Sequence, residues 1–245
     1  MSGMFLSNFR RLHAISADDL AALAGVAEPL FVSPAESIVA RCDDELAAAT
    51  VLLQGVVRRT KARRDGSRQI LAVHFAGDVI DLWPVAGHRY DTIEAVTVCK
   101  GVRLPYPALR ALLSERPHLI DAFGEDARLN ARIADERLVS LGRRTALERL
   151  AHLFCEIACR MDAVGLGAGG RYEMPLTQAE IGDLLGLSVV HVNRTLQQLR
   201  STGALTLRSR RLVVHDFELL RKIGEFDASY LGFTVEAPAP SLAVA

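Results

Sequence analysis

The sequence predicts an α+β protein with a β-rich N-terminal part, one long helix and a C-terminal part that combines a helix pair with a hairpin. Short β-rich runs fill residues 38–107, apolar positions recur in steps of three and four after Pro117, and two short apolar rhythms separated by one glycine lie in residues 176–200. A chain of 245 residues, half of them apolar, can bury a sizeable core in more than one domain.

The first part, residues 1–116, is expected to be a compact β barrel or roll with an N-terminal helix. Two β-rich runs flank Asp65-Gly66 in VLLQGVVRRTKARRDGSRQILAVHF, and this dipeptide suits the positive-φ positions of a tight hairpin turn. The basic residues around this hairpin are most simply a solvated edge. They are Arg58, Arg59, Lys61, Arg63, Arg64 and Arg68.

The long helix is predicted over residues 117–142, with Gly142 at its end. Its apolar seam is long enough to pack on a partner, and Asn130 within the seam can fix the register by pairing with its counterpart. Part of the seam must pack on the chain's own β-roll, and the remainder predicts a dimer. The predicted dimerisation residues are Phe123, Ala127, Asn130, Ala134, Leu138 and Leu141.

The third part is expected over residues 143–230, followed by a flexible tail over residues 231–245. Thr145 and Glu148 have the spacing of a capping box, in which a hydroxyl and a carboxylate satisfy free amides at a helix start. A helix is therefore predicted from there to Met161, and the sequence VGLGAGG after it is expected to be a loop.

The stretch LTQAEIGDLLGLSVVHVNRTLQQLR predicts two helices joined by a tight turn at Gly186. Thr177 and Glu180 form a second capping box, and Ser188 can cap the second helix. Helical periodicity gives this second helix an inner face of Val192, Thr195, Leu196 and Leu199. The opposite face carries Val190, Arg194 and Gln197, flanked by His191, Asn193 and Gln198.

Charge must be considered segment by segment, because 29 basic residues cancel 29 acidic ones over the whole chain. Between Gly186 and His215 there are five arginines and no acidic residue, which makes a local positive surface. The run GALTLRSRRLVVHD then predicts a two-stranded wing with basic residues near its turn. A helix with Arg, Asn and Gln facing outward fits the major groove of DNA; the alternative is a merely solvated polar face.

These motifs resemble the Crp/Fnr superfamily of bacterial transcription regulators, over most of the chain from about Leu30 to Asp216. The resemblance rests on the hairpin, Phe75-Ala76-Gly77-Asp78 with Ile80, the long helix, and above all TQAEIG followed by residues 188–194. It implies a cyclic-nucleotide-binding-like sensory β-roll, a long helix that pairs across a homodimer, and a C-terminal winged helix-turn-helix. Double-stranded DNA is then the expected partner, with RNA polymerase as a further one. In this fold, the basic residues of the hairpin can also contact polymerase, an anionic effector or flanking DNA.

The predicted DNA contacts combine base readers and phosphate contacts. In the family, the residue that matches Arg194 reads a guanine, and the residue that matches Val190 is often glutamate or another polar base reader. Valine can touch a thymine methyl but cannot accept a hydrogen bond from cytosine, so the family's usual half-site is not expected here. The predicted contact residues are Thr177, Ser188, Val189, Val190, His191, Asn193, Arg194, Gln197, Arg208 and Arg210.

The effector is unknown, and the residues argue against cyclic AMP. Relatives that bind cyclic nucleotides hold the phosphate with a Gly-Glu pair followed by arginine and a small hydroxyl residue. Here Asp81-Leu82 takes the first place and Arg89-Tyr90 the second, so only the arginine is retained. A carboxylate at Asp81 and a ring at Tyr90 are expected to repel and crowd a phosphate.

No cofactor or metal ion is expected. Relatives with an iron–sulfur cluster place closely spaced cysteines near the N-terminus, but no cysteine precedes Cys42. Cys155 and Cys159 can share a helix face and are expected to be small core residues. His74 in a strand and His88 in a turn are weak candidates for haem ligation. No Ser/His/Asp or metal-ligand spacing indicates an enzyme.

The N-terminus lacks the pattern of a signal peptide, and no apolar run approaches the length that spans a bilayer, so a cytoplasmic protein without a membrane partner is expected. The leading function is a sequence-specific DNA-binding transcription regulator that acts as a homodimer on a two-fold symmetric site. The alternative is a ligand-sensing or protein-interaction module that has lost DNA binding. Residues 140–142, between the long helix and the next, are expected to transmit any signal from the β-roll.

Overall fold

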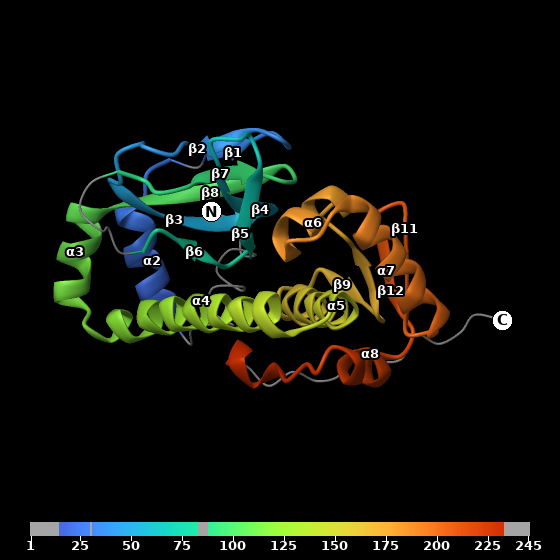
Figure 1. The fold of residues 1–245 in the computed structure, drawn as a ribbon. Helices are drawn as coiled ribbons and strands as arrows, with labels where there is room; N and C mark the ends of the chain where they lie inside the picture. Colours follow the sequence, from blue (N-terminus) through green and yellow to red (C-terminus); the bar gives the residue numbers. More distant parts are fainter. Residues whose placement is uncertain (1–14, 30, 83–87, 233–245) are drawn as a thin grey trace. The chain divides into compact units, whose positions relative to one another are not determined.

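The structure, a computed structural model, describes residues 15–29, 31–82 and 88–232. It divides into two compact units, Met1–Ala131 and Arg132–Ala245, with the division inside the long helix (Figure 1). Antiparallel sheets and helices occur in both units, which confirms the predicted α+β class. No helix in the described ranges is long and apolar enough to cross a bilayer.

The strands of the first unit form two four-stranded antiparallel sheets, in the orders β1-β8-β3-β6 and β2-β7-β4-β5. Helices α2 and α3 contact each other, and both contact β8. The elements are α2 (Ala17–Val26), β1 (Phe31–Ser33), β2 (Ile38–Ala40), β3 (Ala48–Gln54), β4 (Val56–Ala62), β5 (Arg68–Phe75), β6 (Val79–Ile80), β7 (Thr92–Ala95), β8 (Cys99–Pro105), α3 (Tyr106–Glu115) and the start of α4 (His118–Arg143).

The predicted hairpin joins β4 to β5. Gly66 has a φ of 81°, a left-handed conformation that favours glycine, and the Asp65 carboxylate accepts a hydrogen bond of 3.0 Å from the backbone N–H of Ser67. Antiparallel pairing runs from Val56 opposite Phe75 to Ala62 opposite Arg68. The Asp65-Gly66 turn is therefore confirmed.

The basic residues of this hairpin are not all at a solvated edge, as the sequence suggested. Arg58 is only 4% exposed and pairs with Glu94 at 2.9 Å and Glu36 at 3.3 Å. The Nε of Arg59 donates to Asp91 at 2.6 Å. Glu94 on the neighbouring strand β7, Asp91 just before that strand and Glu36 before β2 provide the partners that buried or half-buried charges require. At the tip itself, Arg63 and Arg64 are exposed.

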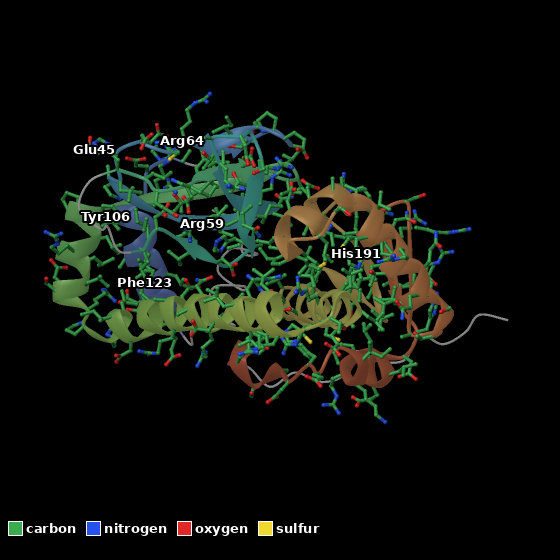
Figure 2. All side chains as sticks on the ribbon, in the orientation of Figure 1. Glu45, Arg59, Arg64, Tyr106, Phe123 and His191 are labelled. Carbon is green, nitrogen blue, oxygen red and sulfur yellow. The ribbon has the colours of Figure 1, made fainter. Side chains whose placement is uncertain are left out.

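Phe123 belongs to the core of the first unit and not to an exposed dimer seam. It is 1% exposed and clusters with Leu119 of the same helix face, with Val102 and Leu104 of β8, and with Leu112 of α3. Ala127, one turn further along, packs partly against the same cluster. The apolar face at the start of α4 therefore packs in the core of the first unit. Figure 2 labels Phe123 on this helix.

The second unit surrounds helix α5, which contacts α7 and α8. Its sheet has the strand order β11-β12-β10-β9. The elements after α4 are α5 (Ala146–Ala163), β9 (Gly167–Ala168), β10 (Arg171–Glu173), α6 (Gln178–Leu185), α7 (Val189–Ser201), β11 (Leu205–Arg208), β12 (Arg211–Val214), α8 (Phe217–Ile223) and the 3-10 helix η1 (Ala228–Leu231).

The expected loop VGLGAGG is instead half of a small hairpin. Strand β9 pairs with β10, with Ala168 opposite Arg171, and the two residues between them are Gly169 at φ 57° and Gly170 at φ 74°. A Cβ at Gly170 would lie 2.8 Å from the carbonyl oxygen of Val214, so glycine also lets this turn approach β12. The glycines mark a tight turn inside a sheet and not an irregular connection.

Helix α5 begins at the predicted capping box, since the Thr145 hydroxyl accepts from Glu148 N and the Glu148 carboxylate accepts from Thr145 N. Cys155 and Cys159 lie buried on it, and burial raises the pKa of the Cys159 thiol to about 12, consistent with core residues. Among the described residues, no group of three or more His, Cys, Asp or Glu side chains is arranged to hold a metal ion. Leu231, the first residue of the predicted tail, is buried; residues 233–245 lie outside the described residues.

Candidate nucleic-acid interface

Helices α6 and α7 form a helix pair with a very close turn. Gly186 caps α6 in the left-handed conformation at φ 65°, as the sequence predicted. Gly182 of α6 is a position where the turn comes close to the helix, because a Cβ there would lie 2.5 Å from the carbonyl oxygen of Leu187. That close backbone approach accompanies a hydrogen bond of 3.0 Å from Leu187 N to Gly182 O. Glycine at position 182 therefore sets how closely the turn packs on α6.

The two faces of α7 agree with the helical periodicity of the sequence. Val192, Thr195, Leu196 and Leu199 are all buried. Val190 is 80% exposed and Val189 is 50% exposed, while Arg194 and Gln197 are exposed on the same side of the helix as Val190. An exposed pair of valines at the start of a helix is unusual enough to suggest a contact surface.

The polar residues of α7 differ in how freely they can contact a partner. Asn193 donates to Gln178 of α6 at 3.2 Å, and Gln197 donates to Asn193 at 3.1 Å, so these amides form a chain between the two helices. The guanidinium of Arg194, by contrast, has no hydrogen bond or ion pair within the described part of the chain. Arg194 is thus available to a ligand, whereas Asn193 is already oriented by the protein.

Hydroxyl caps begin both helices of the pair. Thr177 caps α6, accepting from Glu180 N at 3.3 Å, and Ser188 caps α7, accepting from His191 N at 3.2 Å. Each hydroxyl uses an acceptor lone pair in the cap and keeps its own O–H for donation. Exposed helix N-termini with free donors suit DNA phosphates. His191, labelled on α7 in Figure 2, is half-buried beside this cap.

The predicted wing is present as β11 and β12, with Leu205 opposite Val214 and Arg208 opposite Arg211. Its two-residue turn holds Ser209 at φ 46° and Arg210 at φ 63°, as a type I′ turn requires. The Arg210 guanidinium donates to the carbonyl oxygens of Met174 and Pro175, before α6. Arg210 therefore ties the wing to the helix pair, and the sequence did not indicate this role.

A further arginine joins three segments of the second unit. From α5, Arg149 donates to the carbonyl oxygens of Leu141 at 2.8 Å, Arg144 at 2.9 Å and Leu185 at 3.1 Å. These carbonyls lie at the end of α4, in the joint after it and at the end of α6. Because the last carbonyls of a helix lack partners inside the helix, one guanidinium here caps two helices. The joint itself is residues 144 and 145, slightly later than expected, since α4 continues to Arg143.

In the first unit, the arginine at the phosphate position is already neutralised. Arg89 is 6% exposed and pairs with Asp81 and, at 3.3 Å, with Asp91. Burial lowers the pKa of Arg89, but the carboxylates of Asp81 and then Asp91 raise it by more than burial lowers it. The pKa of Arg89 is therefore above its usual value. Asp81 has a φ of 58°, and its carbonyl accepts from the Tyr106 hydroxyl at 2.5 Å. The guanidinium of Arg89 therefore already has the carboxylates of Asp81 and Asp91 as partners.

Tyr90 does not have the crowding role that the sequence suggested. Its side chain is 68% exposed, and the ammonium of Lys61 lies 3.9 Å from the centre of its ring. The carboxylates of Asp81 and Asp91 lie at the Arg89 guanidinium, whereas the ring of Tyr90 contacts Lys61. Arg89 is thus both ion-paired and buried.

The predicted dimerisation residues divide along α4. Phe123 and Ala127 pack in the first unit as described, whereas Ala134 is exposed, Leu138 is 69% exposed, and Leu141 is half-buried. The Asn130 side-chain amide donates to the carbonyl oxygen and carboxylate of Asp126, both at 3.0 Å, which orients it along its own helix. Val139, not in the predicted seam, is 49% exposed beside Leu138.

Comparisons with known proteins agree with this geometry. Residues 31–116 match the cyclic nucleotide-binding domain family, and residues 148–223 match the Crp-like helix-turn-helix domain family. The nitrogen fixation regulation protein FixK of Azorhizobium caulinodans is 34% identical over 184 residues, covering 74% of this chain and 73% of FixK. A probable transcriptional activator of Rhizobium leguminosarum is 30% identical, over 70% of this chain and 71% of its own length.

Solved structures show the same architecture. FixK2 from Bradyrhizobium japonicum superposes with a TM-score of 0.73 at 26% identity, covering 83% of this chain and all of that chain. The c-di-GMP-responsive regulator CLP of Xanthomonas campestris superposes with a TM-score of 0.67 at 16% identity, which shows the fold alone. The exposed face of α7, the wing and the relationship to FixK together show that this chain belongs to the Crp/Fnr family of DNA-binding transcription regulators.

Proposed function

We propose that the chain acts as a homodimer on a two-fold symmetric DNA site, with α7 of each protomer in the major groove. The observation that carries this proposal is the exposed face of α7, where the guanidinium of Arg194, without a partner among the described residues, lies beside the exposed Val190 in a segment free of acidic residues. A guanidinium without an internal partner is suited to bind guanine O6 and N7 together. Thr177 and Ser188, at the starts of α6 and α7, then contact phosphates.

The dimer is supported by the second half of α4. Leu138 and Val139 expose large apolar side chains on a helix of 26 residues, about 39 Å long at 1.5 Å per residue. Two such helices can bury this surface against each other, and Ala134 allows close approach one turn earlier. Since Phe123 faces its own core, the proposed dimer contact is confined to residues 134–141.

The effector is proposed to be neither cyclic AMP nor an iron–sulfur cluster at the N-terminus. A phosphate would have to displace Asp81 or Asp91 from Arg89, and both carboxylates would then face it inside a buried cluster. RNA polymerase is the proposed protein partner, and the exposed Arg64 at the β4–β5 tip is a candidate contact.

The test is selection of binding sites from random duplexes with purified protein, followed by sizing of the complex at one fixed salt concentration. Enrichment of a two-fold symmetric site bound by two chains is the expected result. Enrichment of a single half-site bound by one chain would refute the dimer, and the absence of any enriched sequence would favour the alternative function, a module that no longer binds DNA.

A further inference from the structure

A polar groove lies between the end of α7 and the wing. Its volume is about 630 Å³, and its lining combines the last turns of α7 with β11. The lining residues are Gln197, Arg200, Ser201, Thr206 and Arg208. Three of them, Arg200, Ser201 and Thr206, are absent from the DNA contacts that the sequence predicts.

The charges of this groove are unbalanced. Arg200 and Arg208 are both exposed, and neither guanidinium has a hydrogen bond or ion pair inside the described ranges. None of the described residues that line the groove is acidic. Two cations that face one hollow without a counter-charge repel each other. An anion placed between them is attracted to both, and this attraction outweighs the repulsion between the cations.

The other polar groups of the groove are already engaged. The Ser201 hydroxyl donates to the Gln198 carbonyl at 2.7 Å, and the Thr206 hydroxyl is 2.8 Å from Nε2 of His215. The side-chain amide of Gln197 donates to Asn193. The two guanidinium groups are therefore the main donors left for a ligand, and their planar geometry matches paired oxygens of a phosphate.

The groove also continues the face of α7 that carries Val190 and Arg194. Residues 190, 194, 197 and 201 follow one another in steps of four, three and four, which places them on one side of the helix. Thirteen residues make α7 about 20 Å long at 1.5 Å per residue, longer than the roughly 12 Å width of the major groove. If α7 crosses the groove with its start on the base edges, its end therefore reaches the sugar–phosphate wall.

We propose that this groove, here called the phosphate groove, binds one phosphodiester of the DNA backbone between Arg200 and Arg208. The inference rests on the proposed function, because it assumes that α7 lies in the major groove. It assigns different tasks to the arginines: Arg194 reads a base, whereas Arg200 and Arg208 hold the backbone and fix how far the helix enters.

The first experiment measures affinity against salt concentration for an enriched duplex and for a scrambled duplex. Arg200→Ala and Arg208→Ala should each weaken binding to both duplexes and make the slope of log affinity against log salt shallower, by up to about 0.9 for each half-site and about 1.8 for a dimer on both. Arg200→Lys should retain the slope, because the charge stays. Arg221→Ala is the matched control, since Arg221 is an exposed arginine paired with Glu218 outside the groove, and it should leave the slope unchanged.

The second experiment places single neutral methylphosphonates along the backbone of the enriched duplex. At one position in each half-site, the neutral linkage should weaken binding by the parent protein but should not weaken binding by Arg200→Ala any further. If no such position exists, the inference is overturned. If no such position exists but inorganic phosphate binds the parent and not Arg200→Ala, then the groove takes free phosphate and the backbone assignment is wrong.

Different results would overturn the proposed function and the phosphate groove. A parent protein that binds no duplex would overturn the proposed function and the phosphate groove with it. A parent protein that binds its enriched duplex while Arg200→Ala and Arg208→Ala keep the parent's slope would overturn only the phosphate groove.

Discussion

Replacing thymine by uracil in the enriched half-site should weaken DNA binding, because Val190 would lose its contact with the thymine methyl group. The substitution removes only the 5-methyl group, which is the part of thymine that a valine can contact. Val190 is 80% exposed in the free chain, so almost all of its side chain is available for burial against DNA. Burial of one methyl group is worth about 0.8 kcal/mol, which corresponds to about fourfold in affinity for one half-site. For a dimer on both half-sites, the same reasoning gives about 1.6 kcal/mol, or about 14-fold.

The assay is a fluorescence anisotropy titration of the parent and of Val190→Ala, with thymine or uracil at each position in turn. At the contacted position, the uracil penalty should be present for the parent and largely lost for Val190→Ala, because the valine methyls that met the thymine methyl are gone. Val98→Ala is the matched control, since Val98 is 54% exposed in the first unit and should leave the penalty intact. Equal penalties in the parent and Val190→Ala, or no penalty at any position, would refute thymine recognition by this residue.

Four expectations concern other parts of the molecule. Arg194→Ala should cost roughly 1–3 kcal/mol at the preferred site and relax discrimination against the wrong base there; an equal loss on all duplexes in the same titration would contradict base reading. Leu138→Glu should give monomers in analytical ultracentrifugation and much weaker DNA binding, because two charges would meet in the proposed contact; a stable dimer of this variant would move the contact elsewhere. Cyclic AMP should change DNA affinity less than about fivefold at fixed salt, since Arg89 is already paired; a tenfold response would show that a phosphate displaces the carboxylates. Arg149→Ala should leave the base preference unchanged but widen the tolerated spacing between half-sites, because the joint after α4 loses its tie to α6; binding to duplexes with one base pair inserted measures this, and unchanged spacing selectivity would contradict it.

The features that the sequence predicts best are those set by residues close together in the chain. Capping boxes depend on two side chains three residues apart, so Thr145 and Thr177 mark helix starts that the structure confirms. Helical periodicity likewise separates the buried Val192 from the exposed Val190. Asp65-Gly66 specifies its turn because the backbone conformation there is local.

The sequence by itself determined that this chain has a β-roll, a long helix and a winged helix pair with a basic face, because spacing and local conformation suffice for those. Only the tertiary structure decided which charges remain available to a ligand. Arg89 and Arg194 are alike in the sequence, but Arg89 pairs with the carboxylates of Asp81 and Asp91, while Arg194 meets no carboxylate among the described residues. Likewise, strand and helix packing decides that Phe123 faces the core and that Arg149 bonds carbonyls of three segments. Such partners lie far apart along the chain or on other elements, and a pattern of spacing carries no information about which of them will meet.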